Sequence, residues 1–259
     1  MARESAGGDV GGVQSVQRAF EILEVMAAGN GSLALSEIAT ATGRPAPSIH
    51  RLIRTLVQLG YVRQDDSRRY ALAPGLIRLG DGAAKQFGSW ADPQLNALVD
   101  MIGETANMAI LEGSQALYVA QVAGRHSMRM FTEVGRRVPL HSTGVGKALL
   151  AQLPEAEVAK ILQMSGMRPA TERTITDPDE LARELAAGRA RGYVSENGEQ
   201  EMGVSCIAVP VLGLPVPTAI SFSGPETRMT SDVARRAAAA LQAAAGSFAK
   251  SSTERANAG

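Results

Sequence analysis

The feature that most constrains the fold is a pair of short helical segments separated by a glycine, within residues 36–59. Ser36 precedes the first segment and is predicted to cap its start, and Gly43 ends that segment. Residues 44–47 (Arg-Pro-Ala-Pro) predict a tight connection, because proline fixes its own backbone and disfavours helix in the preceding residue. A longer helix is predicted at about 47–59. This order predicts a helix-turn-helix, whose second helix typically enters the major groove of DNA.

The predicted second helix has two distinct faces. Its apolar positions have the spacing of one buried helical face, and they are Ile49, Leu52, Ile53, Leu56 and Val57. The opposite face is polar and includes Ser48, His50, Arg51 and Arg54. Polar residues near the start of a recognition helix lie close to base edges, so we expect this face to meet DNA. The alternative is a solvated face, since exposed arginines often contact only water.

Flanking segments complete a winged domain. Residues 15–28 have helical apolar spacing, and residues 61–64 and 69–72 predict two strands around a turn at 65–68. All seven basic residues between Gly12 and Gly75 are arginine, which suits forked contacts to phosphate and guanine. We therefore expect a wing with basic residues near its tip. The residues expected to contact DNA are Arg18, Arg44, Ser48, His50, Arg51, Arg54, Arg68 and Arg69.

Motifs along most of the chain, from about residue 12 to residue 249, closely resemble IclR-type transcriptional regulators. They follow one order along the chain: 15–19 (SVQRA), 35–39 (LSEIA), 48–56 (SIHRLIRTL), 60–62 (GYV), 139–150 (PLHSTGVGKALL), 174–177 (TITD), 191–193 (RGY) and 203–208 (GVSCIA). Within that family, residues 103–110 and 127–130 most resemble the allantoin- and glyoxylate-responsive repressor branch. The resemblance implies a DNA-binding domain joined to a sensor domain.

The second half of the chain predicts an α+β domain with an antiparallel sheet. Its expected strands are 107–112, 116–122, 128–133, 205–212 and 218–222, and its expected helices are 93–105, 144–152, 155–164, 178–191 (with Asp177 as cap) and 231–248. The resemblance implies a GAF-like fold for this domain. We expect a flexible tail at 1–11, a winged helix-turn-helix at 12–74, a linker helix at 75–90, an effector-binding domain at 91–250 and a flexible tail at 251–259.

A ligand site is expected where residues 142–146 (Ser-Thr-Gly-Val-Gly) enter a helix. Free backbone N–H groups at such a position favour an anion, and glycine permits close approach, although glycine there often serves only the turn. The resemblance implies that small carboxylates contact Gly144, Val145, Glu196, Cys206, Ser221 and Ser223. Ser221 and Ser223 have strand spacing and would share a face, where local hydrogen bonding is the alternative role.

One departure from the family pattern bears on specificity. Glu196 stands where the family usually has Asp or Ser. An ionised Glu196 would repel a second carboxylate and accept hydrogen bonds from hydroxyl or ureido groups. This predicts a ligand with one acid end and one donor end.

The predicted function is therefore a sequence-specific regulator, expected to be a repressor whose affinity for a double-stranded DNA operator changes with a small carboxylate or ureide. A homodimer or a dimer of dimers would present two recognition helices to two half-sites. The alternative within the family is an activator that responds to an aromatic or keto acid. A protein-interaction module that keeps the helix-turn-helix as a scaffold is a second alternative.

Other functional classes have weaker support in the sequence. Cys206 with His141 suggests nucleophilic catalysis, but the apolar strand around Cys206 favours an inert thiol, so we expect no enzyme. One cysteine permits no intrachain disulfide, and three scattered histidines favour no metal or other cofactor. No apolar run approaches the roughly 18 residues of a membrane span, so we expect a cytoplasmic protein without a membrane partner.

Overall fold

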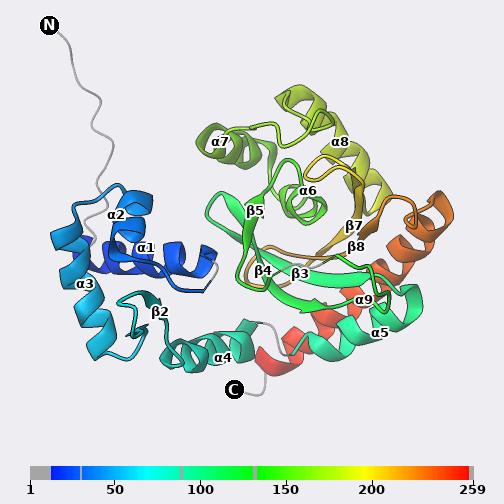
Figure 1. Ribbon diagram of the computed structural model, residues 1–259. Helices are drawn as coiled ribbons and strands as arrows, with labels where there is room; N and C mark the ends of the chain where they lie inside the picture. The colour runs from blue at the N-terminus through cyan, green and yellow to red at the C-terminus, as the bar shows by residue number, and fades with distance from the viewer. Residues whose placement is uncertain (1–12, 30, 88–89, 131–132, 257–259) are drawn as a thin grey trace, which may run out of the picture. The chain divides into compact units, whose positions relative to one another are not determined.

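The chain divides into two compact units, Met1–Ala83 and Ala84–Gly259. A computed structural model describes residues 13–29, 31–87, 90–130 and 133–256, drawn in colour in Figure 1. The predicted tail at 1–11 lies outside the described residues. We describe the two units separately.

The first unit is a winged helix-turn-helix, as the sequence predicted. Three helices pack around a small apolar core to which Ile22, Ile38 and Ile53 contribute, and two short antiparallel strands form the wing. Its elements are α1 (Gln14–Ala28), α2 (Leu35–Thr42), α3 (Ala46–Gln58), β1 (Val62–Gln64) and β2 (Tyr70–Leu72). Gly43 ends α2 in a left-handed conformation (φ 64°), which glycine adopts without steric cost.

The predicted cap at Ser36 is wrong. Helix α2 already begins at Leu35, so Ser36 lies inside its first turn, and Ala34 occupies the cap position with extended backbone. The backbone N–H of Ala34 donates to Oε2 of Glu37 at 2.6 Å. The Glu37 side chain in the first turn thus accepts a hydrogen bond from the backbone at the start of the helix, and no capping serine is needed.

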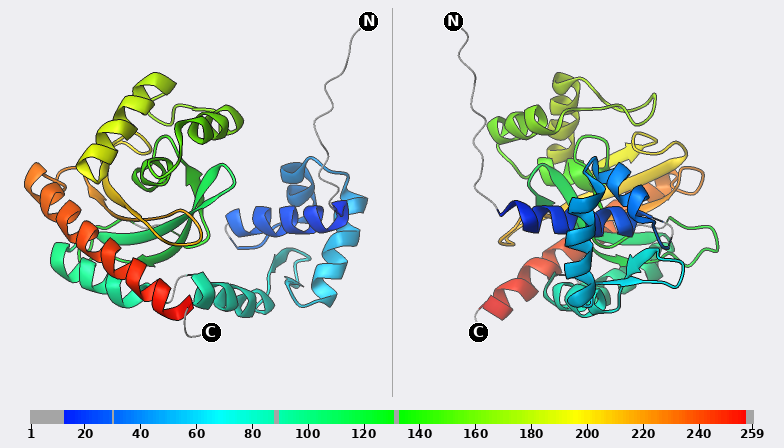
Figure 2. Two further views of the ribbon diagram at one scale, coloured as in Figure 1. Left: turned by 180° about the vertical axis from the view of Figure 1, so that it is seen from behind. Right: turned by 60° about the vertical axis from the view of Figure 1, so that its left-hand side comes forward.

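The second unit is an α+β sandwich built on one antiparallel sheet of six strands, in the order β5-β4-β3-β8-β7-β6. The helices α5 and α9 cover one face, and α6, α7 and α8 cover the other, as Figures 1 and 2 show for this unit. Helix α4 (Gly75–Phe87) precedes it in the chain. The elements are α5 (Asp92–Ile102), β3 (Thr105–Glu112), β4 (Gln115–Val122), β5 (Arg137–Pro139), α6 (Gly144–Leu150), α7 (Glu155–Ser165), α8 (Pro178–Arg191), β6 (Val194–Asn197), β7 (Val204–Val211), β8 (Thr218–Pro225) and α9 (Ser231–Ala256).

Alternation along the central strands separates an apolar face from a partly polar one. On β8, Ile220 and Phe222 belong to the core under α5 and α9. Ser221 and Ser223 therefore point to the opposite face, on the side of α6. The register pairs Ser223 with Cys206 on β7 and with Thr105 on β3, so polar groups of three strands meet there. This strip becomes the floor of the candidate site.

The structure corrects the predicted edges of the sheet. Residues 128–130 and 133 of the predicted strand 128–133 are not in a strand, while residues 131–132 lie outside the description. The edge positions belong instead to β5 and β6, of three and four residues, which sequence spacing did not predict because so short a segment carries little periodicity. The expected tail at 251–259 is helical up to Ala256. None of the described helices combines the length and apolar character that crossing a membrane requires.

Candidate functional sites

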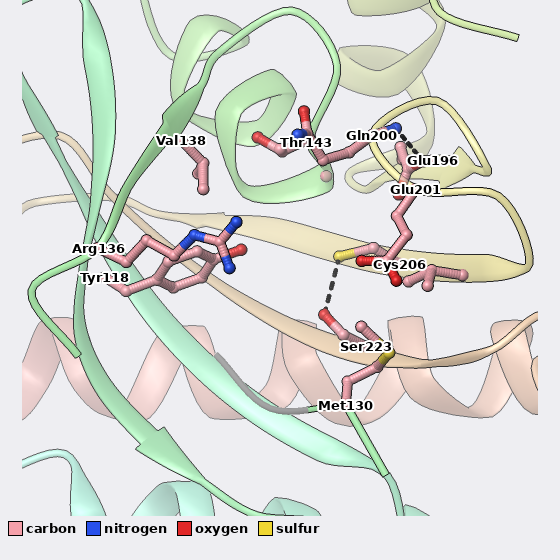
Figure 3. Close-up of a pocket in the computed structure, with 12 residues that line it drawn as sticks. Tyr118, Met130, Arg136, Val138, Thr143, Glu196, Gln200, Glu201, Cys206 and Ser223 are labelled. Atoms are coloured by element: carbon pink, nitrogen blue, oxygen red, sulfur yellow. Dashed lines mark hydrogen bonds between the residues drawn. The ribbon is translucent and has the colours of Figure 1, made fainter. Parts of the chain in front are cut away.

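A small cavity lies between the start of α6, the β4–β5 side of the sheet and the segment that follows β6 (Figure 3). Its volume is about 100 Å³. Cavities for drug-sized ligands typically measure roughly 300–1,000 Å³, so this one suits a molecule of a few heavy atoms. The lining residues are Tyr118, Met130, Arg136, Val138, Thr143, Gly144, Glu196, Gln200, Glu201, Val204, Cys206 and Ser223.

The entry into α6 is fixed by a threonine and requires glycine. Thr143 accepts a hydrogen bond from the N–H of Gly146 and donates one to the carbonyl of Pro139 at 2.6 Å. A Cβ on Gly144 would lie 2.6 Å from Sγ of Cys206, so a larger residue here would require the Cys206 side chain to move. The backbone N–H of Gly144 is hydrogen-bonded to the Cys206 thiol. Part of the predicted anion site is therefore directed at a protein sulfur atom.

Cys206 and Ser223 form the floor of the cavity. Oγ of Ser223 lies 3.6 Å from Sγ of Cys206 and donates to it. Burial raises the pKa of the Cys206 thiol to about 11, so the sulfur is protonated and a poor nucleophile. His141 does not pair with it, because Nε2 of His141 lies 3.1 Å from the carbonyl oxygen of Arg168. The arrangement lacks an activated thiol.

An acidic wall faces the floor, formed by Glu196 on β6 and Glu201 in the segment after it. Oε1 of Glu196 accepts from the backbone N–H groups of Glu199 (2.5 Å) and Gln200 (3.1 Å), which holds this turn against the cavity. Burial raises the pKa of the Glu196 carboxyl to about 7, and the two backbone hydrogen bonds oppose that rise. The ionised Glu196 that we predicted is therefore the major form only above about pH 7.

The opposite wall carries a cation that sequence reasoning missed. In Figure 3, Arg136 and Tyr118 lie on one side of the cavity, while Glu196 and Glu201 lie on the other. No described side chain forms an ion pair or hydrogen bond with the guanidinium of Arg136. Desolvation raises the pKa of the Tyr118 hydroxyl, which remains a neutral hydrogen-bonding group. Arg136 precedes a three-residue edge strand, and only the pairing of that strand with β4 reveals where the side chain lies.

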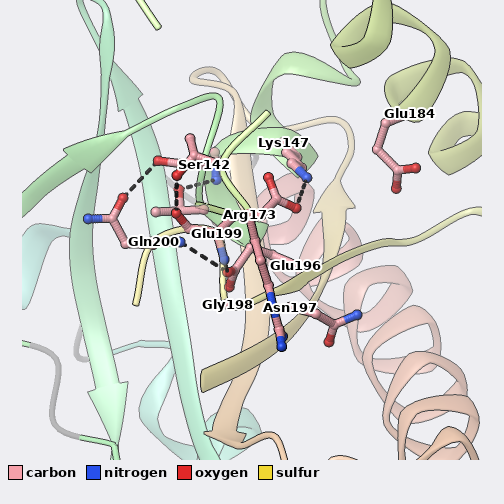
Figure 4. A network of polar contacts seen from close by, with 12 residues as sticks. Ser142, Lys147, Arg173, Glu184, Glu196, Asn197, Gly198, Glu199 and Gln200 are labelled. Atoms are coloured by element: carbon pink, nitrogen blue, oxygen red, sulfur yellow. Dashed lines mark hydrogen bonds and ion pairs between the residues drawn. The ribbon is translucent and has the colours of Figure 1, made fainter. Parts of the chain in front are cut away.

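A polar network behind the cavity joins its walls (Figure 4). Nζ of Lys147, on α6, contacts Oε1 of Glu199, and Oγ of Ser142 donates to Oε1 of Gln200 at 2.7 Å. Thr174 Oγ1 adds a hydrogen bond of 2.6 Å to the carbonyl of Glu199. The segment after β6 is thus tied to α6 and to the preceding loop, which fixes the acidic wall in place.

The structure brings together four of the six predicted ligand contacts, namely Gly144, Glu196, Cys206 and Ser223. Val145 instead packs in the apolar core around α6, and Ser221 is fully buried and does not line the cavity. Met130, which the sequence left open between core and pocket, lines the cavity, while Met128 is 75% exposed.

The predicted DNA-binding residues divide into two groups. His50, Arg51, Arg54 and Arg68 are exposed, and their side chains make no ion pair with another described residue. Three others are held within the unit: Arg18 donates to Gln14 (2.8 Å), Arg44 to Glu21 (2.9 Å) and Arg69 to Glu37 (2.8 Å). Ser48 is half-buried in the first turn of α3. The exposed group on α3 therefore has the better access to an external anion.

An apolar groove lies beside this surface, within the first unit. Residues from α1, α3 and α4 line it, including Val16, Phe20, Leu59 and Leu79. Phe20 is 62% exposed and Leu59 61%. Large exposed apolar side chains gathered on one face are typical of surfaces that contact another molecule.

Comparison with known proteins gives one consistent result. Residues 15–66 match the IclR helix-turn-helix domain, and residues 86–249 match the bacterial transcriptional regulator IclR C-terminal domain. The chain is 37% identical over 230 residues to the transcriptional repressor IclR of Escherichia coli K12, covering 86% of this chain and 84% of that protein. It is 32% identical over 227 residues to the transcriptional repressor AllR of the same strain, covering 85% and 83%. The crystal structure of an IclR transcriptional regulator from Alicyclobacillus acidocaldarius matches with TM-score 0.83 and 28% identity, covering 92% of this chain and 98% of that one.

Proposed function

The chain belongs to the IclR family of bacterial transcriptional regulators, and we propose that it is a repressor released from its operator by a small organic acid or ureide. The helix-turn-helix unit binds DNA, and the second unit is the effector-binding domain. The proposal concerns the sign of regulation, the effector and the residues that recognise each partner.

The two walls of the cavity have opposite charges, and this supports the proposed class of effector. Arg136 offers a cation on one wall, and Glu196 and Glu201 offer hydrogen-bond acceptors on the other. A ligand with a carboxylate at one end and a hydroxyl, amide or ureido donor at the other complements both walls. The volume of about 100 Å³ favours a molecule of glyoxylate size over a bulky aromatic acid.

The exposed side chains of α3 support the proposal for the operator. Arg51 and Arg54 are exposed on the helix expected to enter the major groove, where arginine can bind guanine or phosphate. The wing would add Arg68, which lies at its turn with φ 60°. In this proposal Arg44 and Arg69 act mainly by holding the unit together.

A homodimer, alone or paired into a dimer of dimers, completes the proposed mechanism. The apolar groove around Phe20 and Leu79 would be covered by a second copy, which places two recognition helices on one operator. Effector binding then favours one arrangement of the dimer and thereby changes operator affinity, as thermodynamic linkage requires.

The test is binding of the purified full-length protein to the DNA immediately upstream of its own gene, followed by fluorescence anisotropy. Titrations would add glyoxylate, allantoate, succinate, pyruvate or 4-hydroxybenzoate. The proposal expects specific binding that glyoxylate or allantoate weakens. Succinate as the strongest effector would contradict the acid-and-donor pocket, while tighter binding with pyruvate or 4-hydroxybenzoate would establish the alternative of an activator responding to a keto or aromatic acid.

A further inference from the structure

A fully buried amide lies next to the floor of the cavity, on the same face of the sheet. Asn107 is on β3, opposite Ser221 of β8, and it is 0% exposed. Its Nδ2 atom donates to Oγ of Ser221 at 3.4 Å and to Oγ of Ser223 at 3.3 Å. Ser223 lines the cavity, whereas Asn107 and Ser221 do not. Asn107 therefore reaches the cavity only through the two serines.

Counting protons assigns a direction to these hydrogen bonds. A serine hydroxyl has one proton to donate. Ser223 donates that proton to Sγ of Cys206, so toward Asn107 it can only accept. Hydrogen bonds from Ser221 and Ser223 also lower the pKa of Cys206 against the rise caused by burial. The amide N–H of Asn107 is thus matched to hydroxyls whose own protons point toward the cavity floor.

The stability of the sheet does not explain an asparagine at this position. Its Oδ1 atom is buried and has no hydrogen-bond partner. A buried acceptor left unpaired destabilises the folded protein, and an apolar residue avoids that cost. Neighbours on the same sheet face, such as Ala109 and Ala208, are apolar. The observed contacts give Asn107 one evident task, which is to orient the serines.

We propose that Asn107 is a positioning residue that fixes the hydroxyls of Ser221 and Ser223 as donors toward the cavity floor. The sulfur of Cys206 accepts from both serines, so the floor presents the S–H of Cys206 and selects an acceptor atom of the ligand, such as a carboxylate or carbonyl oxygen. The orientation of the hydroxyls follows from the contacts within this chain. The effect of that orientation on effector binding rests on the proposed function of the cavity.

The single cysteine of the chain allows the orientation to be tested without any effector. Its S–H stretching band in the infrared spectrum reports the hydrogen bonds of one thiol, next to Ser223. We expect Ser223→Ala to shift the band and Asn107→Ala to shift it in the same direction and broaden it, because the serine is then free to rotate. Asn96→Ala, on α5 and remote from the floor, is the control and should leave the band unchanged. A band that Asn107→Ala or Ser223→Ala leaves unmoved overturns the inference.

A second measurement addresses selectivity, with glyoxylate as the probe in isothermal titration calorimetry of the full-length protein. We expect Asn107→Ala to weaken glyoxylate binding about tenfold, which corresponds to roughly 1.4 kcal/mol. The urea midpoint should stay the same or rise, because an unpaired buried acceptor is removed. In a Ser221→Ala/Ser223→Ala background the same change should have no further effect.

If Asn107→Ala weakens glyoxylate binding equally in the Ser221→Ala/Ser223→Ala background, Asn107 does not act through the serines. A loss of affinity that is explained by unfolding of the variant would also overturn the proposal. Failure of the unsubstituted protein to bind glyoxylate would contradict the proposed effector class. The infrared comparison would then still decide the role of Asn107, so the two failures are distinguishable.

Discussion

Nζ of Lys147 lies 2.5 Å from Oε1 of Glu199, and the lysine side chain is only 1% exposed. The pair joins α6, whose first residues line the cavity, to the segment that carries Glu196 and Gln200. Burial raises the pKa of the Glu199 carboxyl, while Lys147 lowers it. The ion pair thus holds two walls of the cavity together at a position with little access to water.

Removing one member of this pair is expected to destabilise the effector-binding unit. Lys147→Met leaves a carboxylate buried without its partner, for which about 3 kcal/mol is typical. The double variant Lys147→Met/Glu199→Leu should recover much of that loss, because no buried charge remains. Urea unfolding followed by the fluorescence of Trp90, the single tryptophan, reports on this unit, where Trp90 packs against Phe248. A double variant no more stable than Lys147→Met would contradict the interpretation.

The raised pKa of Glu196 predicts a specific pH dependence of stability. The pKa of this carboxyl is about 7 in the folded protein, against 4.5 for an ordinary glutamate. Between these values the folded protein keeps a proton that the unfolded chain releases, so stability should fall as pH rises through this window, by about 3 kcal/mol in total. Glu196→Gln cannot release that proton and should lack this part of the decline. Unfolding free energies measured from pH 4.5 to 8 check this, and parallel curves for the two proteins would refute it.

Two adjacent arginines allow a specific role in effector binding to be distinguished from a general effect of surface charge. Arg136 lines the cavity, whereas Arg137 is paired with Glu112 at 2.6 Å. We expect Arg136→Ala to raise the effector concentration that releases half of the operator at least about tenfold, through loss of one charge-assisted hydrogen bond. Arg137→Ala should leave that concentration unchanged, and both variants should bind operator normally without effector. Equal effects of the two substitutions would exclude a specific role for Arg136.

The exposed arginines of α3 are expected to carry operator affinity. Arg51→Ala and Arg54→Ala should each weaken binding by an amount that depends on what they touch. Loss of one phosphate contact reduces the slope of log affinity against log salt by about 0.9, while loss of a base contact relaxes sequence preference. Arg236→Ala, on α9 and also exposed, is the control. Unchanged operator binding in both α3 variants would favour the alternative of a helix-turn-helix kept as a scaffold.

The apolar groove of the first unit predicts a subunit contact. Phe20→Lys places a charge on that surface and should shift the protein toward smaller species in sedimentation velocity, with weaker operator binding. Met164→Lys is a matched control, because Met164 on α7 is exposed to the same extent, 62%. A sedimentation coefficient unchanged by Phe20→Lys would show that the groove has another occupant.

Local sequence patterns determined much of this protein. Helices close their hydrogen bonds within four residues, so apolar spacing and single stop residues such as Gly43 predicted α1, α3 and the helix that Asp177 caps. The motif around Gly144 and the strand bearing Cys206 were predicted with nearly the right bounds. These are features that a short stretch of chain can specify by itself.

Only the tertiary structure decided which side chains share the cavity and what their environment does to them. Arg136 precedes one edge strand of the sheet and Glu196 lies on the other, 60 positions apart in the chain, and the register of six strands sets where each lies. Ser221 and Val145 match the expected motif, yet both are buried by packing and do not line the cavity. The pKa of Glu196 follows from burial, which long-range packing creates. Contacts between distant strands depend on the whole sheet, so no local pattern in the sequence records them.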